Sequence, residues 1–201
     1  MSADPEVQLR ELRKGLGLRP EEIDTRNIAP VLVPSSFFAL GNWPGPHVRL
    51  RAGEIGLAWA VMLPEETMHY VSFSMAEYWD ANNVDWKLLA HGYLQNNTSE
   101  ELGTHAFRPS HGELYALAFM QSDGIGPSRL LLRDQLLARF PGGYKVAVPE
   151  MSCGIAFSVG LEEDELGNIQ RVIERCYQGG TRPLAPSIYS PEDLLPLAEL
   201  R

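Results

Sequence analysis

The spacing of apolar residues changes from every second residue to about every 3.6 residues within the first half of the chain, and this change constrains the fold most. Three segments before the change have the composition of strands: 48–51, 55–63 and 68–74. In the last of them, Ser72 and Ser74 alternate with Val71 and Phe73, which is typical of a strand with one face in water. Because only short turn-like stretches separate the three segments, they predict an antiparallel meander.

Helical spacing follows Asp85, which is a suitable N-cap. Apolar side chains then recur on one helical face: Trp86, Leu89, Ala90, Tyr93 and Leu94. Further helices are predicted over 128–140 and after the acidic run 162–165. The remaining strand-like segments are 104–107, 114–120, 144–148 and 154–159. The pattern favours an α+β fold, with a mostly antiparallel or mixed sheet and helices packed mainly on one face.

The first 47 residues differ from the rest of the chain. Residues 4–16 have the pattern of a short amphipathic helix, and residues 20–24 that of a one-turn helix. The stretch that follows contains prolines that disfavour long regular elements: Pro30, Pro34, Pro44 and Pro46. We therefore predict a helix and a proline-rich appendage over 1–47 and an α+β domain over 48–201, folding together as one cooperative unit.

Charge and hydropathy exclude several classes of protein. With 17 Lys and Arg against 26 Asp and Glu, the formal net charge is −9, the wrong sign for binding nucleic acid or an anionic membrane surface. The longest nearly uninterrupted apolar run, 55–63, is about half as long as a membrane-spanning helix requires. The N-terminus has early acidic residues and no apolar stretch behind a basic start, so we expect a cytoplasmic protein without a secretory signal.

Residues 123–128, Asp-Gly-Ile-Gly-Pro-Ser, join a predicted strand to a predicted helix and are the most chemically suggestive part of the sequence. Glycines at such a junction let backbone N–H groups converge on an anion, so the candidate binding residues are Asp123, Gly124, Gly126 and Ser128. The loop lacks the Gly-Lys-Ser/Thr of a phosphate-binding loop and the third glycine of the dinucleotide motif. Chain reversal alone also explains it, with Asp123 and Gly124 in the turn and Ser128 starting the helix.

Other reactive residue types are scattered. A metal ion could collect ligands from His105, His111 and Glu113 near one hairpin, but their spacing matches no known ligand motif. Ser152-Cys153 invites a nucleophile, yet no Gly-x-Ser-x-Gly motif occurs. We therefore predict no catalytic residue, no metal and no cofactor.

Several features have both a structural and a functional explanation, and we favour the structural one for each. Cys153 and Cys176 lie in apolar patterns, so we expect both to be buried and reduced. The acidic run 162–165 is either a docking surface for a basic partner or a first helical turn that complements the helix dipole. Tyr78-Trp79 and Trp43 form either a recognition patch or part of the core.

The stretch from Asp123 to Phe157 resembles the bacterial YtpQ-like family, in which an Asp-Gly loop precedes a Ser-Leu-Leu helix, a Val-Ala-Val-Pro strand and a final apolar strand. The matching residues are Asp123, Gly124, Ser128, Leu130, Leu131, Leu132, Val146, Ala147, Val148, Pro149, Ile155, Ala156 and Phe157. The helix over 86–94 and the segments 183–184 and 188–189 are also similar, so that the resemblance covers about half of the chain. This chain departs from the pattern at 150–153, Glu-Met-Ser-Cys, where Arg-Asp is expected. The resemblance implies the fold rather than an activity.

Two functional hypotheses follow. The leading one is a non-catalytic bacterial protein of the cytoplasm that acts through a protein partner, as an immunity or accessory protein does. The alternative is an enzyme that binds a small anionic substrate or cofactor at 123–128, with Asp123 as base and His105 or His111 contributed by neighbouring strands. A pocket joining the loop to the histidines would favour the enzyme, and an aromatic or acidic face would favour the binding protein.

Overall fold

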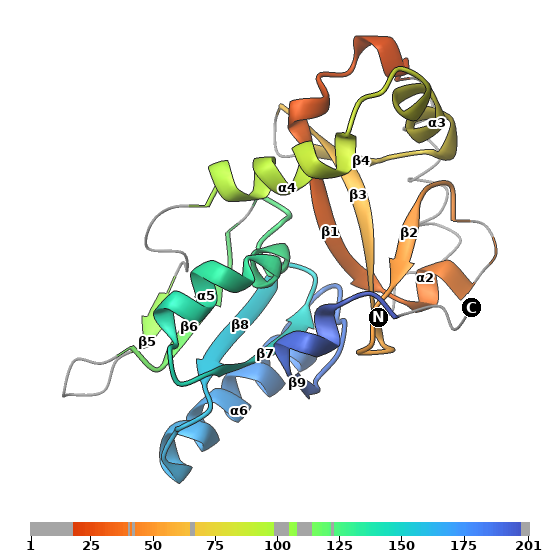
Figure 1. Cartoon of the computed structure of the whole chain (residues 1–201). Coiled ribbons are helices and arrows are strands. Elements are labelled where there is room, and N and C mark those ends of the chain that lie inside the picture. Colours follow the sequence, from red (N-terminus) through yellow and green to blue (C-terminus); the bar gives the residue numbers. More distant parts are fainter. Residues whose placement is uncertain are drawn as a thin grey trace.

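The computed structural model describes residues 18–39, 41, 43–64, 67–98, 105–107, 114–121 and 123–197 (Figure 1). The strands are β1 (Ile28–Pro34), β2 (His47–Arg49), β3 (Ile55–Leu63), β4 (Thr67–Tyr70), β5 (His105–Phe107), β6 (Ala116–Phe119), β7 (Tyr144–Glu150), β8 (Cys153–Ser158) and β9 (Ile188–Tyr189). The α-helices are α2 (Ser36–Ala39), α3 (Phe73–Ala81), α4 (Trp86–Asn96), α5 (Arg133–Arg139) and α6 (Glu163–Gly179), and the 3₁₀ helices are η1 (Pro20–Glu22), η2 (Thr25–Asn27), η3 (Pro127–Leu131) and η4 (Pro191–Leu194). The helix predicted over 4–16 and the hairpin turn at 109–112 lie outside the described residues.

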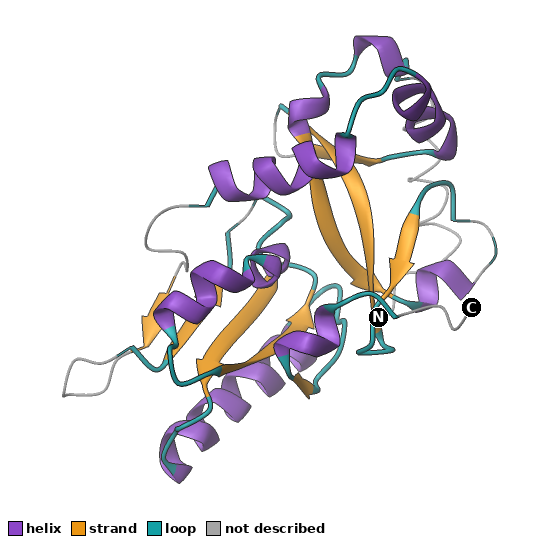
Figure 2. Cartoon of the chain, viewed as in Figure 1, coloured by secondary structure: helices purple, strands orange, loops and turns teal. Residues whose placement is uncertain are grey.

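The α+β class and the antiparallel pairing are confirmed, and the strands divide between two sheets (Figure 2). In the first sheet β3 is central: β1 pairs with one side of it, and β2 and β4 pair with the other. The second sheet has the order β5-β6-β8-β7-β9. Every strand pair in the described chain is antiparallel.

The prediction of a proline-rich loop after residue 24 is wrong, because β1 occupies part of that stretch and pairs with β3 along its whole length. The Leu32 N–H donates to the Ser128 hydroxyl (3.2 Å), so it points away from β3. Backbone direction repeats every two residues in a strand, so the nitrogens of Pro30 and Pro34 also point to this outer edge. Proline therefore costs β1 no hydrogen bond to β3.

The strand predicted over 68–74 ends at Tyr70, and α3 begins at Phe73. The Ser72 hydroxyl accepts the Met75 N–H (3.2 Å) and thereby caps the helix. The short alternation of apolar and polar residues that predicted a strand here is therefore the entry into a helix. Trp79 in α3 is buried, as is Trp43, while Tyr78 remains exposed.

Apolar side chains cover both faces of the second sheet, whereas the sequence pattern indicated helices mainly on one face. α6 packs on the face that carries Ala118, Ile155 and Phe157, and η3 and α5 pack on the opposite face (Figure 2). The helix predicted over 128–140 is interrupted at Leu132, whose ψ angle is 62°. This residue turns its side chain into a cluster with Ile125 and Met151, so tertiary burial overrides helical continuity.

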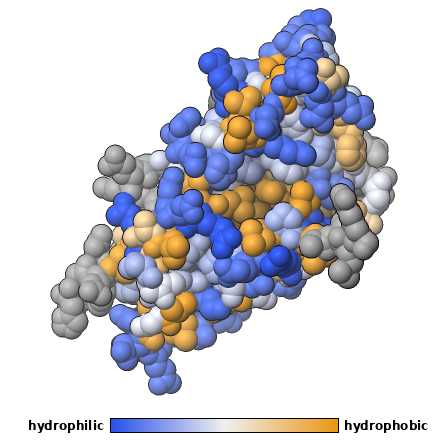
Figure 3. All heavy atoms as spheres, in the orientation of Figure 1, coloured by the Kyte–Doolittle hydropathy of each residue, from blue (hydrophilic) through white to orange (hydrophobic). Residues whose placement is uncertain are grey.

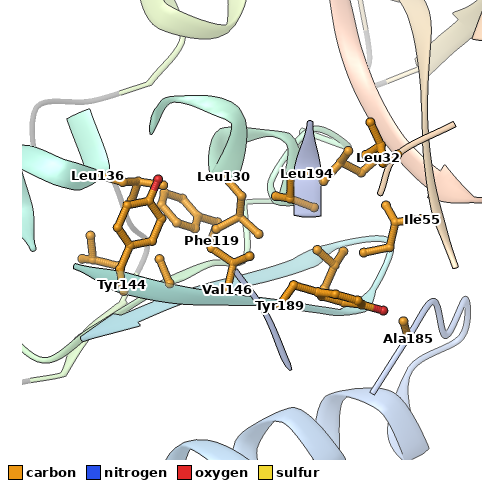
Figure 4. Close-up of a cluster of buried hydrophobic side chains, with 14 of the residues drawn as sticks. Leu32, Ile55, Phe119, Leu130, Leu136, Tyr144, Val146, Ala185, Tyr189 and Leu194 are labelled. Atoms are coloured by element: carbon orange, nitrogen blue, oxygen red, sulfur yellow. The ribbon is translucent and has the colours of Figure 1, made fainter. Parts of the chain in front are cut away.

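The two sheets share one core (Figure 4). Leu32 and Ile55 of the first sheet face Leu130, Tyr189 and Leu194 across the junction. Figure 3 shows a hollowed hydrophobic area where the two sheets meet, surrounded by hydrophilic side chains. No helix in the described part of the chain has the length and apolar character to cross a bilayer.

Candidate functional site

The loop over 123–128 follows β6 and runs into the first two residues of η3, where Ser128 contacts β1 of the other sheet. The Asp123 carboxylate accepts the Ile125 N–H (3.1 Å), which closes a tight turn. Gly124 occupies the turn with φ +77°, a left-handed conformation that favours glycine. Gly126 is needed for another reason, because a Cβ there would lie 2.9 Å from the Phe119 carbonyl oxygen.

A buried guanidinium, which the sequence argument did not identify, explains the aspartate of this loop. The Arg129 side chain is 2% exposed and donates to both carboxylate oxygens of Asp123 (Nη2–Oδ2 2.5 Å, Nη1–Oδ1 3.2 Å). Its Nη2 also donates to the carbonyl oxygen of Asn97 at the end of α4 (2.8 Å). A buried charge without a partner lowers the stability of the fold. By pairing with the Arg129 guanidinium, Asp123 therefore stabilises the contact between η3 and α4.

The candidate binding residues therefore lie together, but the polar side chains of Asp123 and Ser128 bond to other groups of the same chain. Asp123 pairs with Arg129, and Ser128, which is buried, accepts the Leu32 N–H from β1. Burial raises the pKa of the nearby Tyr93 phenol, and the Asp123 charge adds to this while Arg129 opposes it. Among the described residues, the hydrogen-bond partners of Asp123 include no histidine, so the contacts of the loop add no support to the enzyme hypothesis.

The predicted histidine hairpin is only partly described. His105 is exposed in β5 opposite Ala118, whereas His111 and Glu113 lie outside the described residues. Within the part of the chain that the structure describes, no three His, Cys, Asp or Glu side chains are grouped so that they could hold a metal ion.

A second buried acidic residue, Glu150, lies at the end of β7, directly before the turn to β8. Glu150 is 5% exposed and accepts the Ser152 N–H (2.5 Å), the Ser152 hydroxyl and the Arg182 N–H (3.1 Å). The Ser152 hydroxyl thus donates to a carboxylate that already holds two backbone groups. An acidic residue at the end of a mostly apolar strand was the available signal for this arrangement. The Arg182 N–H comes from a residue 32 positions away, so the sequence alone does not indicate this hydrogen bond.

Two grooves lie near the edge strand β9: one is lined by Ile188 of the strand, and the other by Ser190 and Pro191, which follow it. The α5–β7 groove, about 500 Å³, is lined by Arg133, Asp134, Leu137, Gly143, Tyr144, Lys145, Val159, Ser190, Pro191 and Glu192. The α6–β9 groove, about 480 Å³, is lined by Gln170, Ile173, Glu174, Tyr177, Gln178, Pro186 and Ile188. Charges of both signs surround the first groove, with Arg133 paired to Glu192 (2.7 Å). Glu174 is the charged residue among the lining residues of the second.

The acidic run 162–165 leads into α6, as expected for an acid-rich first turn. The Glu162 N–H donates to Glu165 Oε2 (3.1 Å), so one carboxylate caps the helix. Glu163 is exposed on the same helix as Glu174. The dipole explanation therefore accounts for the position of the run and leaves part of its charge facing solvent.

Comparison of the chain with protein-family models, curated proteins and solved structures found no match. The resemblance to the YtpQ-like family therefore stays a prediction from the residue pattern.

Proposed function

We propose that this chain is a non-catalytic binding protein of the bacterial cytoplasm, and that its α6–β9 groove docks a basic segment of another protein. The observation that supports this function is an exposed apolar side chain, Ile188, in a groove beside an edge strand, with the Glu174 carboxylate on the rim of the groove. An exposed apolar surface bordered by polar groups is the general form of a protein interaction site.

The floor of the groove is apolar. Ile188 is 39% exposed, and Tyr189, the next residue, packs into the junction core, so alternation along β9 places Ile188 on the α6 side. Ile173 and Tyr177 of α6 form the facing wall. No described strand pairs with β9 on the side away from β7, so its outer side is accessible to an incoming segment.

One carboxylate, that of Glu174, lies on the rim of the groove. The Glu174 carboxylate is exposed and is oriented by Gln178, whose Nε2 donates to Oε1 (2.8 Å). Glu163 precedes it by eleven residues, about three helical turns, and therefore lies on the same side of α6, about 16 Å away along the axis. A segment lying along α6 would meet both carboxylates. The matching partner carries an apolar side chain for the groove and Lys or Arg for the rim, and the net charge of −9 attracts it at long range.

A random peptide library displayed on phage tests this function with a defined probe. We expect the selected peptides to combine Lys or Arg with a large apolar residue and to bind more weakly as salt is raised. Ile188→Asp and Glu174→Lys should each weaken the binding at least about tenfold. The matched controls, Leu137→Asp and Asp134→Lys in the α5–β7 groove, should change it by less than about twofold.

The wild-type protein and the same four variants are then used to capture partners from a native lysate at low salt. A partner captured by the wild-type protein must be lost with the two α6–β9 variants and retained with the two controls. The proposal is wrong if no peptide and no stoichiometric partner is recovered. It is equally wrong if the recovered peptides lack basic residues, or if all four variants behave alike.

A further inference from the structure

The two cysteines of the chain come from different elements and meet beneath α6. Cys153 begins β8 and Cys176 lies near the end of α6, and their sulfur atoms are 3.5 Å apart. Both are free thiols. Cys176 packs against the buried cluster that contains Cys153, together with Ile169 and Ile173 of the same helix.

We propose that Cys153 and Cys176 form a redox-active thiol pair, which a hydroperoxide converts into a disulfide that links α6 to the second sheet. The bond length of a disulfide is about 2.05 Å, so the sulfurs need to approach by about 1.5 Å. Side chains that already touch can cover this distance with small torsional changes. The sequence spacing of 23 residues gives no indication of this contact, because only the packing of α6 on the sheet creates it.

The different environments of the two thiols fix the order of the steps. Cys153 is 2% exposed, and burial raises the pKa of its thiol, with smaller contributions from the Cys176 sulfur and the Glu150 carboxylate. Cys176 is partly exposed, so it is the thiol that an oxidant reaches first. Cys153 is protected from solvent and is placed to react with whatever forms on Cys176.

The chemistry balances with a hydroperoxide as the oxidant. The Cys176 sulfur, having given up its proton, attacks one peroxide oxygen, the O–O bond breaks, and the products are a sulfenic acid on Cys176 and an alcohol, or water from hydrogen peroxide. The Cys153 sulfur then attacks the Cys176 sulfur. The S–S bond forms, the S–O bond breaks, and hydroxide leaves as water with the Cys153 proton. The two thiols lose two electrons and two protons, and the peroxide is reduced.

The experiment treats the reduced full-length protein with stoichiometric hydrogen peroxide. We expect both free thiols to disappear, the intact mass to fall by about 2 Da, and peptide mapping to find Cys153 linked to Cys176 within one chain. Dithiothreitol should restore both thiols. The oxidised protein should melt several degrees higher than the reduced protein, because the bond closes a loop and constrains the unfolded chain.

Single variants separate the roles of the two thiols. Cys153→Ala should leave a sulfenic acid on Cys176 that dimedone traps, and Cys176→Ala should leave Cys153 much slower to oxidise than the wild-type pair. If a variant does not fold, the mapping of the wild-type protein decides alone. Two intact thiols after oxidation, oxygen addition without a cross-link, or a disulfide between two chains would each overturn the proposal.

Discussion

β1 is one edge strand of the first sheet and β9 is one edge strand of the second, and the two edges differ in how they are protected. At β1, the outward positions carry Pro30 and Pro34, which have no N–H, and the Leu32 N–H between them is satisfied by Ser128. α4 and η3 pack along the same edge. At β9 the edge is two residues long, and the α6–β9 groove lies beside it.

An unpaired strand edge attracts other chains, and proteins protect such edges with prolines, short strands or covering elements. The outer edge of β1 has two prolines and is covered by α4 and η3, so it is protected against pairing with another strand. β9 has only its shortness as protection, and Ile188 remains exposed beside it. The contrast shows that the outer edge of β1 is better protected against strand pairing than the outer edge of β9.

The largest expected effect comes from removing the Asp123 carboxylate, which pairs with Arg129 and so holds η3 and α4 beside β1. Asp123→Ala leaves the buried guanidinium of Arg129 without its carboxylate, which should lower the free energy of unfolding by about 2–3 kcal/mol. This estimate is at the low end for a buried pair, because Asp123 itself is 38% exposed and water replaces part of the interaction. Urea unfolding measures the loss, and the melting temperature should fall by roughly 5–10 °C.

Asp134→Ala is the matched control, because this aspartate is exposed in the first turn of α5. Its effect should be within about 0.5 kcal/mol. Equal stability of the Asp123 variant and wild type would contradict the structural role of the loop. Ligand-induced stabilisation that is lost only in Asp123→Ala would return the loop to the candidate binding sites.

A smaller effect is expected from Ser128→Ala, which acts directly on the edge of β1. Ser128 is buried, so the variant leaves the Leu32 N–H without its acceptor and should cost about 1–2 kcal/mol. Amide hydrogen exchange at Leu32 should accelerate, because this N–H then lacks protection. Ser158→Ala, at the end of β8, provides a comparison in which the Leu32 amide is untouched. Unchanged exchange at Leu32 would show that another group protects this edge.

The regions that the sequence predicted well are those in which burial itself sets the spacing of residues. The strand Ile55–Leu63 and the helix beginning at Trp86 follow from apolar periodicity, and Asp85 caps the helix as expected (Asp85 Oδ1 to Leu88 N, 3.2 Å). β1 was missed because proline disfavours central strands, whereas at an outer edge its missing N–H does no harm.

The candidate site was predictable only in part, since its contacts join residues that are far apart in sequence. The loop over 123–128 was identified correctly as a turn before a helical segment, but the partner of its aspartate is the side chain of Arg129, whose burial no local pattern indicates. The α6–β9 groove needs Tyr177 and Ile188 to be neighbours. Only the packing of β9 on β7 brings them together.

The smallest expected effect concerns how β9 is attached to the first sheet. The Tyr189 hydroxyl donates to Glu54 Oε2 (2.6 Å), and the Ser187 hydroxyl donates to the same oxygen (3.0 Å). Tyr189→Phe removes the first bond and leaves the second, and Glu54 is exposed to water. We therefore expect a loss of about 1 kcal/mol at neutral pH.

Alkaline pH tests whether the Tyr189 phenol is buried and hydrogen-bonded in the folded protein. Burial, followed by the hydrogen bond to Glu54, raises the pKa of Tyr189 above its unfolded value of about 10. The stability contributed by the neutral phenol is therefore complete below about pH 10 and is lost as the pH rises through the pKa of the folded state. Burial also raises the pKa of Tyr70 to about 12, so wild type and Tyr189→Phe both lose stability in alkali. Wild type loses more, because it also contains Tyr189. The gap between wild type and Tyr189→Phe in urea unfolding should thus narrow above about pH 10. A gap that stays constant with pH would mean that the Tyr189 phenol is neither buried nor hydrogen-bonded to Glu54 in the folded protein, which would contradict this attachment of β9.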